Sequence, residues 1–355
     1  MSGLKELKSR IRTVDSTMKI TSAMKMVSVS RLRKSHALLQ DAYPYADEMN
    51  RVFRRLVRNI SSLKQTDQKI SFPLLLKGRP DPKTHLLVCV TSDEGLCGQF
   101  NETVLKRFED VLAVLRSEDT KQKINVLCFG YRGGEVLRKK HPELSVHILS
   151  RTFDRKVSLF NEAQKLSLRL TDMFYAGRFD ICTVIYSAFM SAIEQKTKVE
   201  QLVPLEMFLH ENKWDFLMSN EDPVYVKRDV LGQKKIKTPA LKVLGALGGK
   251  HMQSPLEKMD TDELLKTSTR TADVYDYYPQ GLSLLEEVLP YYVESYFYKI
   301  LLETAASENA FRMMSMENAS KSAAEKKSAL AKQYHRKRQE LVTKELVEIT
   351  AATGV

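Results

Sequence analysis

The C-terminal part of the chain is a long stretch without helix-breaking residues. Neither glycine nor proline occurs between residues 291 and 353. One α-helix over this stretch, rising about 1.5 Å per residue, would be roughly 95 Å long. Helices of globular proteins usually run about 8–20 residues, so this length indicates a coiled coil, a helical rod or a membrane span. Recurring charges such as Glu303, Lys326 and Arg338 exclude the membrane span. We therefore expect a helical rod that needs a partner for its apolar side.

The N-terminal segment has the pattern that such a partner requires. Residues 4–43 also lack glycine and proline, and their first apolar residues alternate three and four apart, at Leu4, Leu7, Ile11, Val14 and Met18. This spacing draws one apolar seam along a helix. We expect the seam to continue through Ile20, Met24 and Val27 and to resume beyond Pro44, where a proline bends a helix. Two long terminal helices predict an antiparallel coiled coil with the middle of the chain at one end.

Methionines lie along both predicted helices. Because methionine makes adaptable apolar contacts, we expect most of them in the core of the coiled coil: Met24, Met26, Met313, Met314 and Met316. Alanine and serine are frequent between residues 305 and 324, which favours a close approach of the two helices.

The middle of the chain changes to the pattern of an α/β domain. Residues 72–82 contain three prolines and a glycine and are interpreted as a linker. Short apolar or alternating runs predict strands at 86–90, 124–129, 146–149, 181–186 and 197–203. Helical patterns lie between them at 103–115 and 158–175. Strands that alternate with helices of this length indicate a mostly parallel, Rossmann-like sheet.

The predicted fold class is therefore α/β, with an antiparallel coiled coil of long N- and C-terminal helices and a central, mostly parallel α/β domain. The expected units are an N-terminal coiled-coil helix over 1–64, a central α/β domain over 83–209, an insertion or long excursion over 210–276 and a C-terminal coiled-coil helix over 277–355. The segment 210–276 combines three prolines with a glycine-rich patch and the only tryptophan, Trp214.

Positive charge is concentrated at the N-terminus. The formal net charge of the chain is +12. Residues 1–64 hold 14 lysines and arginines against 5 acidic residues, whereas residues 291–355 hold 10 against 8. An acidic partner should therefore meet the N-terminal helix. Both a nucleic acid and an acidic protein surface satisfy this condition, so a basic coiled-coil scaffold that binds nucleic acid stays open as an alternative function.

The sequence contains no pattern of a metal site or a disulfide framework. Neither spacing is found among the cysteines, which we expect to be buried and reduced: Cys89, Cys97, Cys128 and Cys182. The seven histidines are scattered, without the spacing of metal ligands. We expect no catalytic residue, no cofactor and no metal.

Two glycine-containing stretches follow predicted strands, where a phosphate loop could lie. Residues 91–98 follow the first predicted strand, where an α/β nucleotide site would place its phosphate loop. They lack the required glycine spacing, and Asp93 with Glu94 would repel a phosphate. We interpret these residues, and residues 130–134 after the second strand, as structural or docking turns. A nucleotide-dependent enzyme that uses the turn at 95–98 is a second alternative.

Several stretches of the chain resemble signature segments of one family. Residues 18–27 (MKITSAMKMV) are similar to the N-terminal signature of the γ subunit of rotary, F-type ATP synthases. Residues 307–313 (SENAFRM) and 338–346 (RQELVTKEL) resemble the C-terminal signature of that family. Residues 92–98 (SDEGLCG) and 189–192 (FMSA) resemble its central domain. The matches occur in the right order along the chain.

The resemblance implies a function. The γ subunit of this family is a non-catalytic rotor shaft that couples proton translocation through the membrane sector to ATP synthesis. Its terminal helices lie inside a ring of α and β subunits, and its α/β domain docks on the ε (or δ) subunit and the ring of c subunits. The resemblance further implies partner contacts at Met24, Lys25, Asp93, Glu94, Cys97, Arg312, Arg338 and Gln339.

The implied contacts fall into three places. Arg338 and Gln339 match a contact with a loop of the β subunit, whereas Met24, Lys25 and Arg312 match positions where the shaft passes the lower rim of the ring. Asp93, Glu94 and Cys97 belong to the turn at 92–98, which the resemblance places beside an acidic loop of the β subunit.

The chain departs from the family pattern at two places. The family usually has arginine at the position of Glu94, so the expected charge of that contact is reversed. Residues 210–276 exceed the usual connection, and they lack the regulatory cysteine pair that the chloroplast form carries in an insertion. We expect a protein peripheral to an energy-transducing membrane, the mitochondrial inner membrane on its matrix side, with the bacterial plasma membrane and the thylakoid as alternatives, and no nucleic acid partner.

Overall fold

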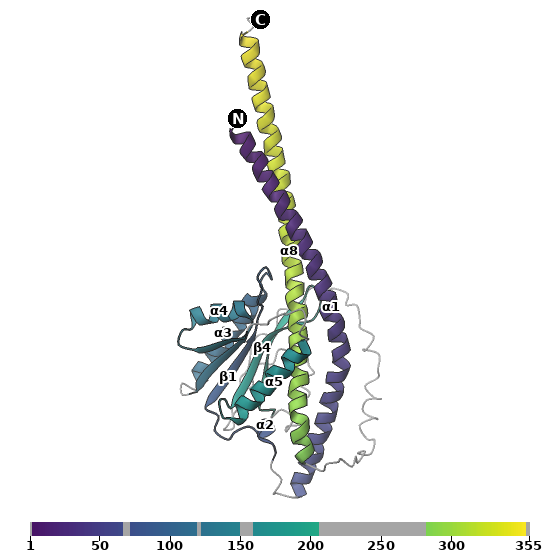
Figure 1. Ribbon diagram of the computed structural model, residues 1–355. Coiled ribbons are helices and arrows are strands. Elements are labelled where there is room, and N and C mark those ends of the chain that lie inside the picture. The colour runs from purple at the N-terminus through teal and green to yellow at the C-terminus, as the bar shows by residue number, and fades with distance from the viewer. Residues whose placement is uncertain (1, 67–71, 119–121, 150–158, 206–281, 353–355) are drawn as a thin grey trace, which may run out of the picture.

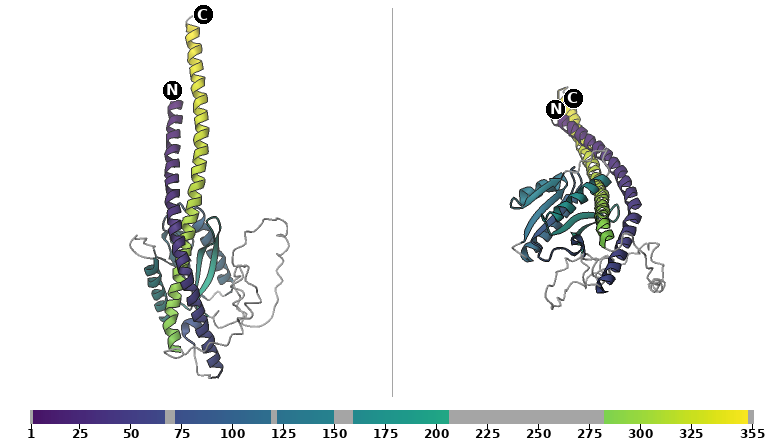
Figure 2. Two further views of the ribbon diagram at one scale, coloured as in Figure 1. Left: turned by 90° about the vertical axis from the view of Figure 1, so that its right-hand side faces the viewer. Right: turned by 60° about the horizontal axis from the view of Figure 1, so that its bottom comes forward.

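A computed structural model shows how the elements are arranged (Figure 1). It describes residues 2–66, 72–118, 122–149, 159–205 and 282–352. The expected insertion at 210–276 lies outside the described residues. Two long helices run beside each other, and a sheet with its own helices packs against the lower half of the pair (Figures 1 and 2).

The long helices are α1 (Ser2–Thr66) and α8 (Leu282–Ala352). They are antiparallel, because the residue numbers of their contacts rise along α1 and fall along α8. These contacts are Asp15 with Lys327, Lys25 with Glu317, Tyr43 with Glu303 and Phe53 with Tyr292. Both chain ends therefore lie at the same end of the molecule, and α8 projects beyond the start of α1 (Figure 1). The predicted antiparallel pair of terminal helices is confirmed.

The apolar seam of α1 differs from the prediction. Ile20, Met26 and Val27 are exposed, with 59%, 70% and 52% of their surface accessible. Buried residues instead follow a seven-residue repeat at Leu32, Leu39, Ala46 and Phe53. A heptad repeat keeps one helix face against its partner, and extending this one toward the N-terminus leads through Lys25 and Met18. The predicted seam positions Ile20 and Val27, and the predicted core position of Met26, are therefore wrong.

Prolines lie inside both long helices. α1 continues through Pro44 and α8 through Pro290. A proline removes one backbone hydrogen bond and bends a helix, and buried residues on either side of Pro44 hold the two halves of α1 against α8. α1 curves along α8 over its length (Figure 2).

The sheet has five strands in the order β3-β2-β1-β4-β5. Their bounds are Thr84–Val90 for β1, Lys123–Phe129 for β2, Ser145–Leu149 for β3, Ile181–Phe189 for β4 and Gln195–Val203 for β5. β1 pairs in parallel with β2 and β4, and β2 pairs in parallel with β3. β5 returns antiparallel to β4. The predicted mostly parallel sheet is confirmed.

Helices cover both faces of the sheet. α3 (Phe100–Glu118) and α4 (Tyr131–Lys140) lie on the face to which Leu87 of β1 points. α5 (Leu159–Tyr175) and the lower part of α8 lie on the face of Val88. Neighbouring strand residues point to opposite faces, so the continuous apolar run in β1 supplies two separate cores. This is why α8 is at once half of the helical pair and a covering helix of the sheet.

The segment predicted as a linker is packed. Residues 74–77 form a short helix, α2 (Leu74–Lys77), in which Leu75 and Leu76 are buried. The backbone N–H of Leu205 donates to the carbonyl of Leu75 at 3.0 Å. Pro73 precedes this turn and Gly78 follows it, and Leu75 and Leu76 between them belong to the core. The linker interpretation is therefore wrong for these residues.

The turn predicted at 130–134 is the start of helix α4. Gly130 has a φ of +125°, and a Cβ there would overlap the Thr91 carbonyl. A Cβ at Gly134 would lie 2.6 Å from the Ile148 side chain. These glycines let α4 approach the strands closely, and they also remove the apolar periodicity by which a helix is found in a sequence. The prediction of a turn is therefore wrong for this stretch.

All four cysteines are buried thiols without a disulfide, as predicted. Within the described ranges, no group of three or more histidine, cysteine, aspartate or glutamate side chains is placed to hold a metal ion. No helix in that part of the chain is both long and apolar enough to cross a membrane.

A buried histidine makes the stability of the sheet depend on pH. His85 of β1 is buried, and its Nε2 lies 2.9 Å from the Thr183 hydroxyl of β4. Burial lowers the pKa of His85 from 6.5 to about 4. Between these two values the unfolded chain binds a proton that the folded chain does not, so the free energy of unfolding falls as the pH falls.

We expect His85→Gln to flatten this pH dependence. In urea unfolding followed by circular dichroism between pH 6.5 and about 4, the wild type should lose up to about 1.4 kcal/mol per pH unit more than the variant. His147→Gln, at an exposed position of β3, is the matched control and should keep the wild-type slope. Equal slopes in all three proteins would contradict the assignment.

Candidate partner-contact site

The turn after β1 lies where the strand order of the sheet reverses. β1 leads to β2 on one side, and β4 pairs with its other side. In open α/β sheets, ligands bind in the crevice outside the carboxyl ends of such strands. Here α8 occupies that position, because the Ser307 hydroxyl lies 2.6 Å from that of Ser187 in β4, and Phe311 packs edge-on against Phe100. A nucleotide at the turn would have to displace the helix.

Hydrogen bonds within this turn enclose Cys97. The Asn101 amide donates to the Ser92 hydroxyl at 2.8 Å, and its nitrogen lies 3.4 Å from the Cys97 sulfur. The Ser92 hydroxyl also lies 2.8 Å from the Glu94 carbonyl. Only 3% of Cys97 is accessible. Its thiol therefore packs inside the turn, while Leu96 beside it is exposed at a φ of +63°.

Asp93 connects the turn to α4. Its carboxylate accepts a hydrogen bond at 2.7 Å from the backbone N–H of Tyr131, the first residue of α4. The first N–H groups of a helix have no partner within the helix, and a negative charge there is favourable to the helix dipole. Asp93, whose negative charge is unfavourable for a phosphate, thus stabilises the start of α4.

Arg312 of α8 reaches the same turn from inside the molecule. Its guanidinium donates to Glu308 at 2.7 Å, and the two side chains are only 5% and 7% exposed. The same nitrogen lies 3.5 Å from the carbonyl oxygen of Gly95. A buried charge needs a partner and further hydrogen bonds, and this arrangement supplies both. Arg312 therefore joins α8 to the turn after β1.

Glu94 is paired within the chain. Its carboxylate lies 3.4 Å from Arg31 of α1, with side chains that are 67% and 45% exposed. Such exposed ion pairs contribute about 0–1 kcal/mol, so the pair orients the two side chains more than it stabilises the fold. The acidic residue at a position where arginine was expected thus stands beside an arginine from the neighbouring helix.

Met24 and Lys25 lie on α1, closer to its N-terminus than Arg31. Lys25 forms an ion pair with Glu317 of α8, and 40% of its side chain remains exposed. Met24 is half-buried. Both residues therefore lie at the edge of the contact between the helices, with part of each side chain facing outward.

Arg338 and Gln339 lie far from the other candidates. They are 26 or more residues beyond Arg312, or about 39 Å along the helix. Both are exposed, at the level where α1 begins, since Lys337 lies beside Gly3. Beyond this point α8 continues without α1 (Figure 1).

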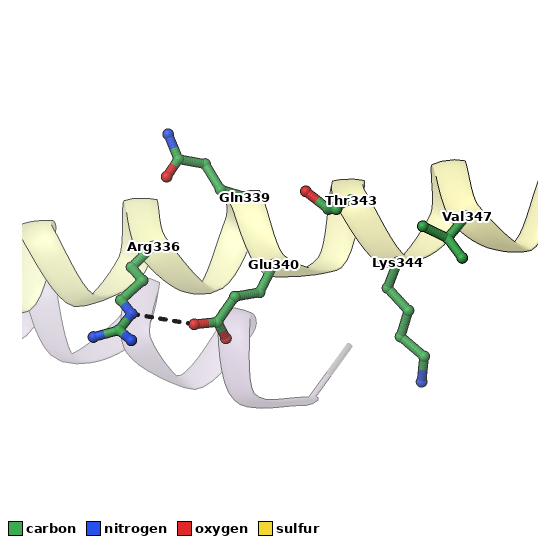
Figure 3. A pocket seen from close by; sticks show the side chains of 6 residues that line it. All are labelled: Arg336, Gln339, Glu340, Thr343, Lys344 and Val347. Atoms are coloured by element: carbon green, nitrogen blue, oxygen red, sulfur yellow. Dashed lines mark hydrogen bonds and ion pairs between the residues drawn. The ribbon is translucent and has the colours of Figure 1, made fainter.

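The surface of α8 at this end is shallow and mixed in character. A hollow there is lined by Arg336, Gln339, Glu340, Thr343, Lys344 and Val347 (Figure 3). Arg336 pairs with Glu340 at 3.2 Å, while Gln339 points away from that pair (Figure 3). All six residues belong to one helix, so the described residues give the hollow no opposite wall.

The structure thus brings four of the eight predicted residues together and leaves two pairs apart, one of which is Met24 and Lys25 on α1. Asp93, Glu94, Cys97 and Arg312 meet at the turn after β1, whereas Arg338 and Gln339 lie at the tip of α8. Sequence reasoning missed Arg31 and Glu308. The spacing of Glu308 and Arg312, four residues apart on a helix, is a signal for an ion pair, whereas nothing in the sequence indicates that Arg31 meets Glu94.

Removal of the buried guanidinium should destabilise the chain. Arg312→Ala removes the guanidinium that pairs with the buried Glu308, and we expect a loss of roughly 3–5 kcal/mol in unfolding free energy. The matched control is Arg336→Ala, which removes an ion pair of the same spacing on the same helix at 84% exposure and should cost less than about 1 kcal/mol. Urea unfolding of the purified chain measures both. A similar loss in the two variants would contradict the role given to burial.

Comparisons with known proteins agree along the whole chain. A family described as ATP synthase matches residues 3–354. The ATP synthase gamma chain of Paramagnetospirillum magneticum is 30% identical over 349 residues, which cover 98% of each chain. That of Gluconobacter oxydans is 31% identical over 349 residues, with the same coverage of 98% for both chains.

Solved structures show the same fold. The chain matches one in the central stalk and c-ring structure of the Tetrahymena thermophila mitochondrial ATP synthase with a TM-score of 0.51 and 23% identity, covering 85% of this chain and 99% of that one. It matches one in the Euglena gracilis mitochondrial ATP synthase with a TM-score of 0.57 and 14% identity, covering 99% and 94%. Taken with the family match and the relatives that it covers almost completely, these observations show that the chain belongs to the family of ATP synthase γ chains.

Proposed function

We propose that this chain is the central rotor shaft of an F-type ATP synthase, which couples proton translocation through the membrane sector to ATP synthesis at the ring of α and β subunits. One observation carries the proposal: α1 and α8 form a long antiparallel rod with two different ends. At one end only α8 continues, and near the other end the sheet domain packs on one side of the rod. The family to which the chain belongs supports the same role.

The asymmetry of the rod is what a rotor requires. The sheet lies on one side of α8 only, and α1 lies on another (Figure 2). A surrounding ring of subunits therefore meets a different surface at each angle of the rod. As the rod turns, each catalytic site of the ring would be pushed through its conformations in sequence.

The sheet domain is the part suited to receive the torque. It is fixed to α8 by the contact of Arg312 with the Gly95 carbonyl and by the contact between Ser187 and Ser307. In the proposed complex it docks on the ε (or δ) subunit and the ring of c subunits. Rotation applied to the domain would then be transmitted to α8 without slippage.

The candidate contacts divide along the rod in the same way. At the tip, Arg338 and Gln339 are exposed and carry donors for a carbonyl- or carboxylate-rich loop of the β subunit. Nearer the sheet, Met24, Lys25 and Glu94 face outward at the level of the lower rim of the ring. Arg312 supports this contact from inside the chain, because it holds the turn that carries Glu94.

The chain itself is proposed to be non-catalytic, with the chemistry of ATP in the α and β subunits. We place the complex on an energy-transducing membrane, and propose the mitochondrial inner membrane, on its matrix side. The basic N-terminal helix and the long segment at 210–276 support that compartment over the bacterial plasma membrane and the thylakoid.

Composition of the native complex tests the function directly. Native mass spectrometry of the complex that co-purifies with this chain from its own membranes should find one copy with three α and three β subunits and ATPase activity. Isolation without ATPase subunits, or with nucleic acid, would overturn the proposal.

The tip contact makes a separate prediction. In the assembled enzyme, Arg338→Ala with Gln339→Ala should lower the rate of ATP synthesis by about tenfold or more, because charge-assisted hydrogen bonds contribute about 1.5–3 kcal/mol and about 1.4 kcal/mol corresponds to a factor of ten. The matched control is Lys332→Ala with Gln333→Ala, an exposed basic residue and glutamine on the same helix, which should have a smaller effect. Unchanged torque and ATPase rate in the first variant would count against the contact.

A further inference from the structure

Polar side chains are buried where α1, α8 and the sheet meet. The group includes two carboxylates from different elements, Glu200 of β5 and Glu303 of α8. Three tyrosines and two lysines face them: Tyr43, Tyr186, Tyr296, Lys198 and Lys299. Glu303 and Tyr186 are only 2% and 1% exposed. The contact that holds the sheet on the helical pair is therefore partly polar and contains charge.

The two carboxylates are not equally satisfied. Glu200 accepts a hydrogen bond from Tyr186 at 3.1 Å and a second, short one from Tyr296, and its side chain is 21% exposed. Lys198 lies 3.9 Å away. Glu200 thus has two donors, a nearby cation and access to water.

Glu303 has much less support for a negative charge. One oxygen accepts a hydrogen bond from Tyr43 of α1 at 3.1 Å. Lys299 lies 3.9 Å from that oxygen, beyond hydrogen-bonding distance, and its ammonium stands over the Tyr43 ring, 5.5 Å from the centroid. The other oxygen is buried and has no hydrogen-bond partner among the described residues. A buried carboxylate with one oxygen unsatisfied is less favourable in its ionised form than as the neutral acid.

Charges on every surrounding element act on Glu303. Burial raises its pKa above the ordinary value, and the charge of Glu200 on the sheet raises it further. Lys299 on α8, Lys198 on the sheet and the hydrogen bond from Tyr43 on α1 act in the opposite direction without reversing the result. Burial also raises the pKa values of Tyr43, Tyr186 and Tyr296, so these hydroxyls remain donors and Glu303 is the group that changes.

We propose that Glu303 is a positioning residue that makes the joint between the sheet and the two long helices proton-dependent. With the proton bound, the joint closes on a neutral carboxyl that Tyr43 holds in place. When the proton is lost, the buried charge repels Glu200 across the joint and draws water and Lys299 toward its unsatisfied oxygen. The proposal goes beyond the proposed function, since it concerns how firmly the sheet domain is fixed to the rod.

The direction of the effect follows from the raised pKa. The folded state holds the proton of Glu303 to a higher pH than the unfolded or opened state, in which the pKa of this carboxyl is the ordinary 4.5. The stability that this proton gives the joint is therefore fully present below pH 4.5. It is lost as the pH rises through the raised pKa that Glu303 has in the folded state. Because one proton is involved, opening increases by at most about tenfold per pH unit.

Hydrogen exchange in the assembled complex tests the joint. Amide exchange would be followed by mass spectrometry between pH 5 and about 9 and corrected for the intrinsic pH dependence of exchange, with peptides from residues 39–46, 195–203 and 296–307. In the wild type, opening of these segments should rise with pH, by up to about tenfold per unit. Glu303→Gln keeps an acceptor for Tyr43 and has no proton to lose, so its opening should not change with pH.

Two further variants keep the test decisive. Glu325→Gln, at an exposed position of α8, is the matched control and should keep the wild-type pH response. Tyr43→Phe removes the hydroxyl that donates to Glu303, and it should shift the response to higher pH. The proposal would be overturned if opening of the wild type did not change with pH, or if Glu303→Gln kept the wild-type pH dependence. It would also be overturned if Tyr43→Phe did not shift that dependence along the pH axis. Each outcome is independent of whether the complex contains ATPase subunits.

Discussion

Packing of α1 along α8 is the contact on which the rest of the molecule depends. Isolated helices are marginal in water, and most helical stability in proteins comes from burying an apolar face. Here the buried face of α1 includes Leu32, Leu39, Ala46 and Phe53, seven residues apart, and Phe53 stacks on Tyr292 of α8. On one face the sheet packs against α8 beside its own helix α5, so the rod determines the position of the domain.

Three environments follow one another along α8. Its lower part is buried on nearly all sides between α1, α5 and the sheet, as Leu289, Phe297 and Leu301 show. Its middle carries the buried pair of Glu308 and Arg312 at the turn after β1. Its upper part is exposed and charged. One helix thus serves as core element, connector and free tip, and this order matches the proposed path of torque from the sheet domain to the catalytic ring.

Polar groups are used where the parts of the molecule must hold one arrangement. Two polar contacts join the sheet domain to the rod, one from Arg312 to the Gly95 carbonyl and one from Tyr296 to Glu200. Buried ionic groups contribute little net stability compared with apolar packing, but removing one partner is costly. We infer that these contacts make the position of the domain specific, while the apolar cores provide the stability.

From the sequence alone follow the two long helices, the parallel sheet and the buried cysteines, because each rests on local periodicity or on an apolar run. Helix α4 did not follow, since glycines chosen for close packing on Thr91 and Ile148 erase the helical pattern. The true seam of α1, and the pairing of Arg31 with Glu94, Arg312 with Gly95 and Tyr43 with Glu303, were decided only by the tertiary structure. These contacts join residues far apart in the chain, and a sequence pattern records which face of an element is apolar but not which element will lie against it.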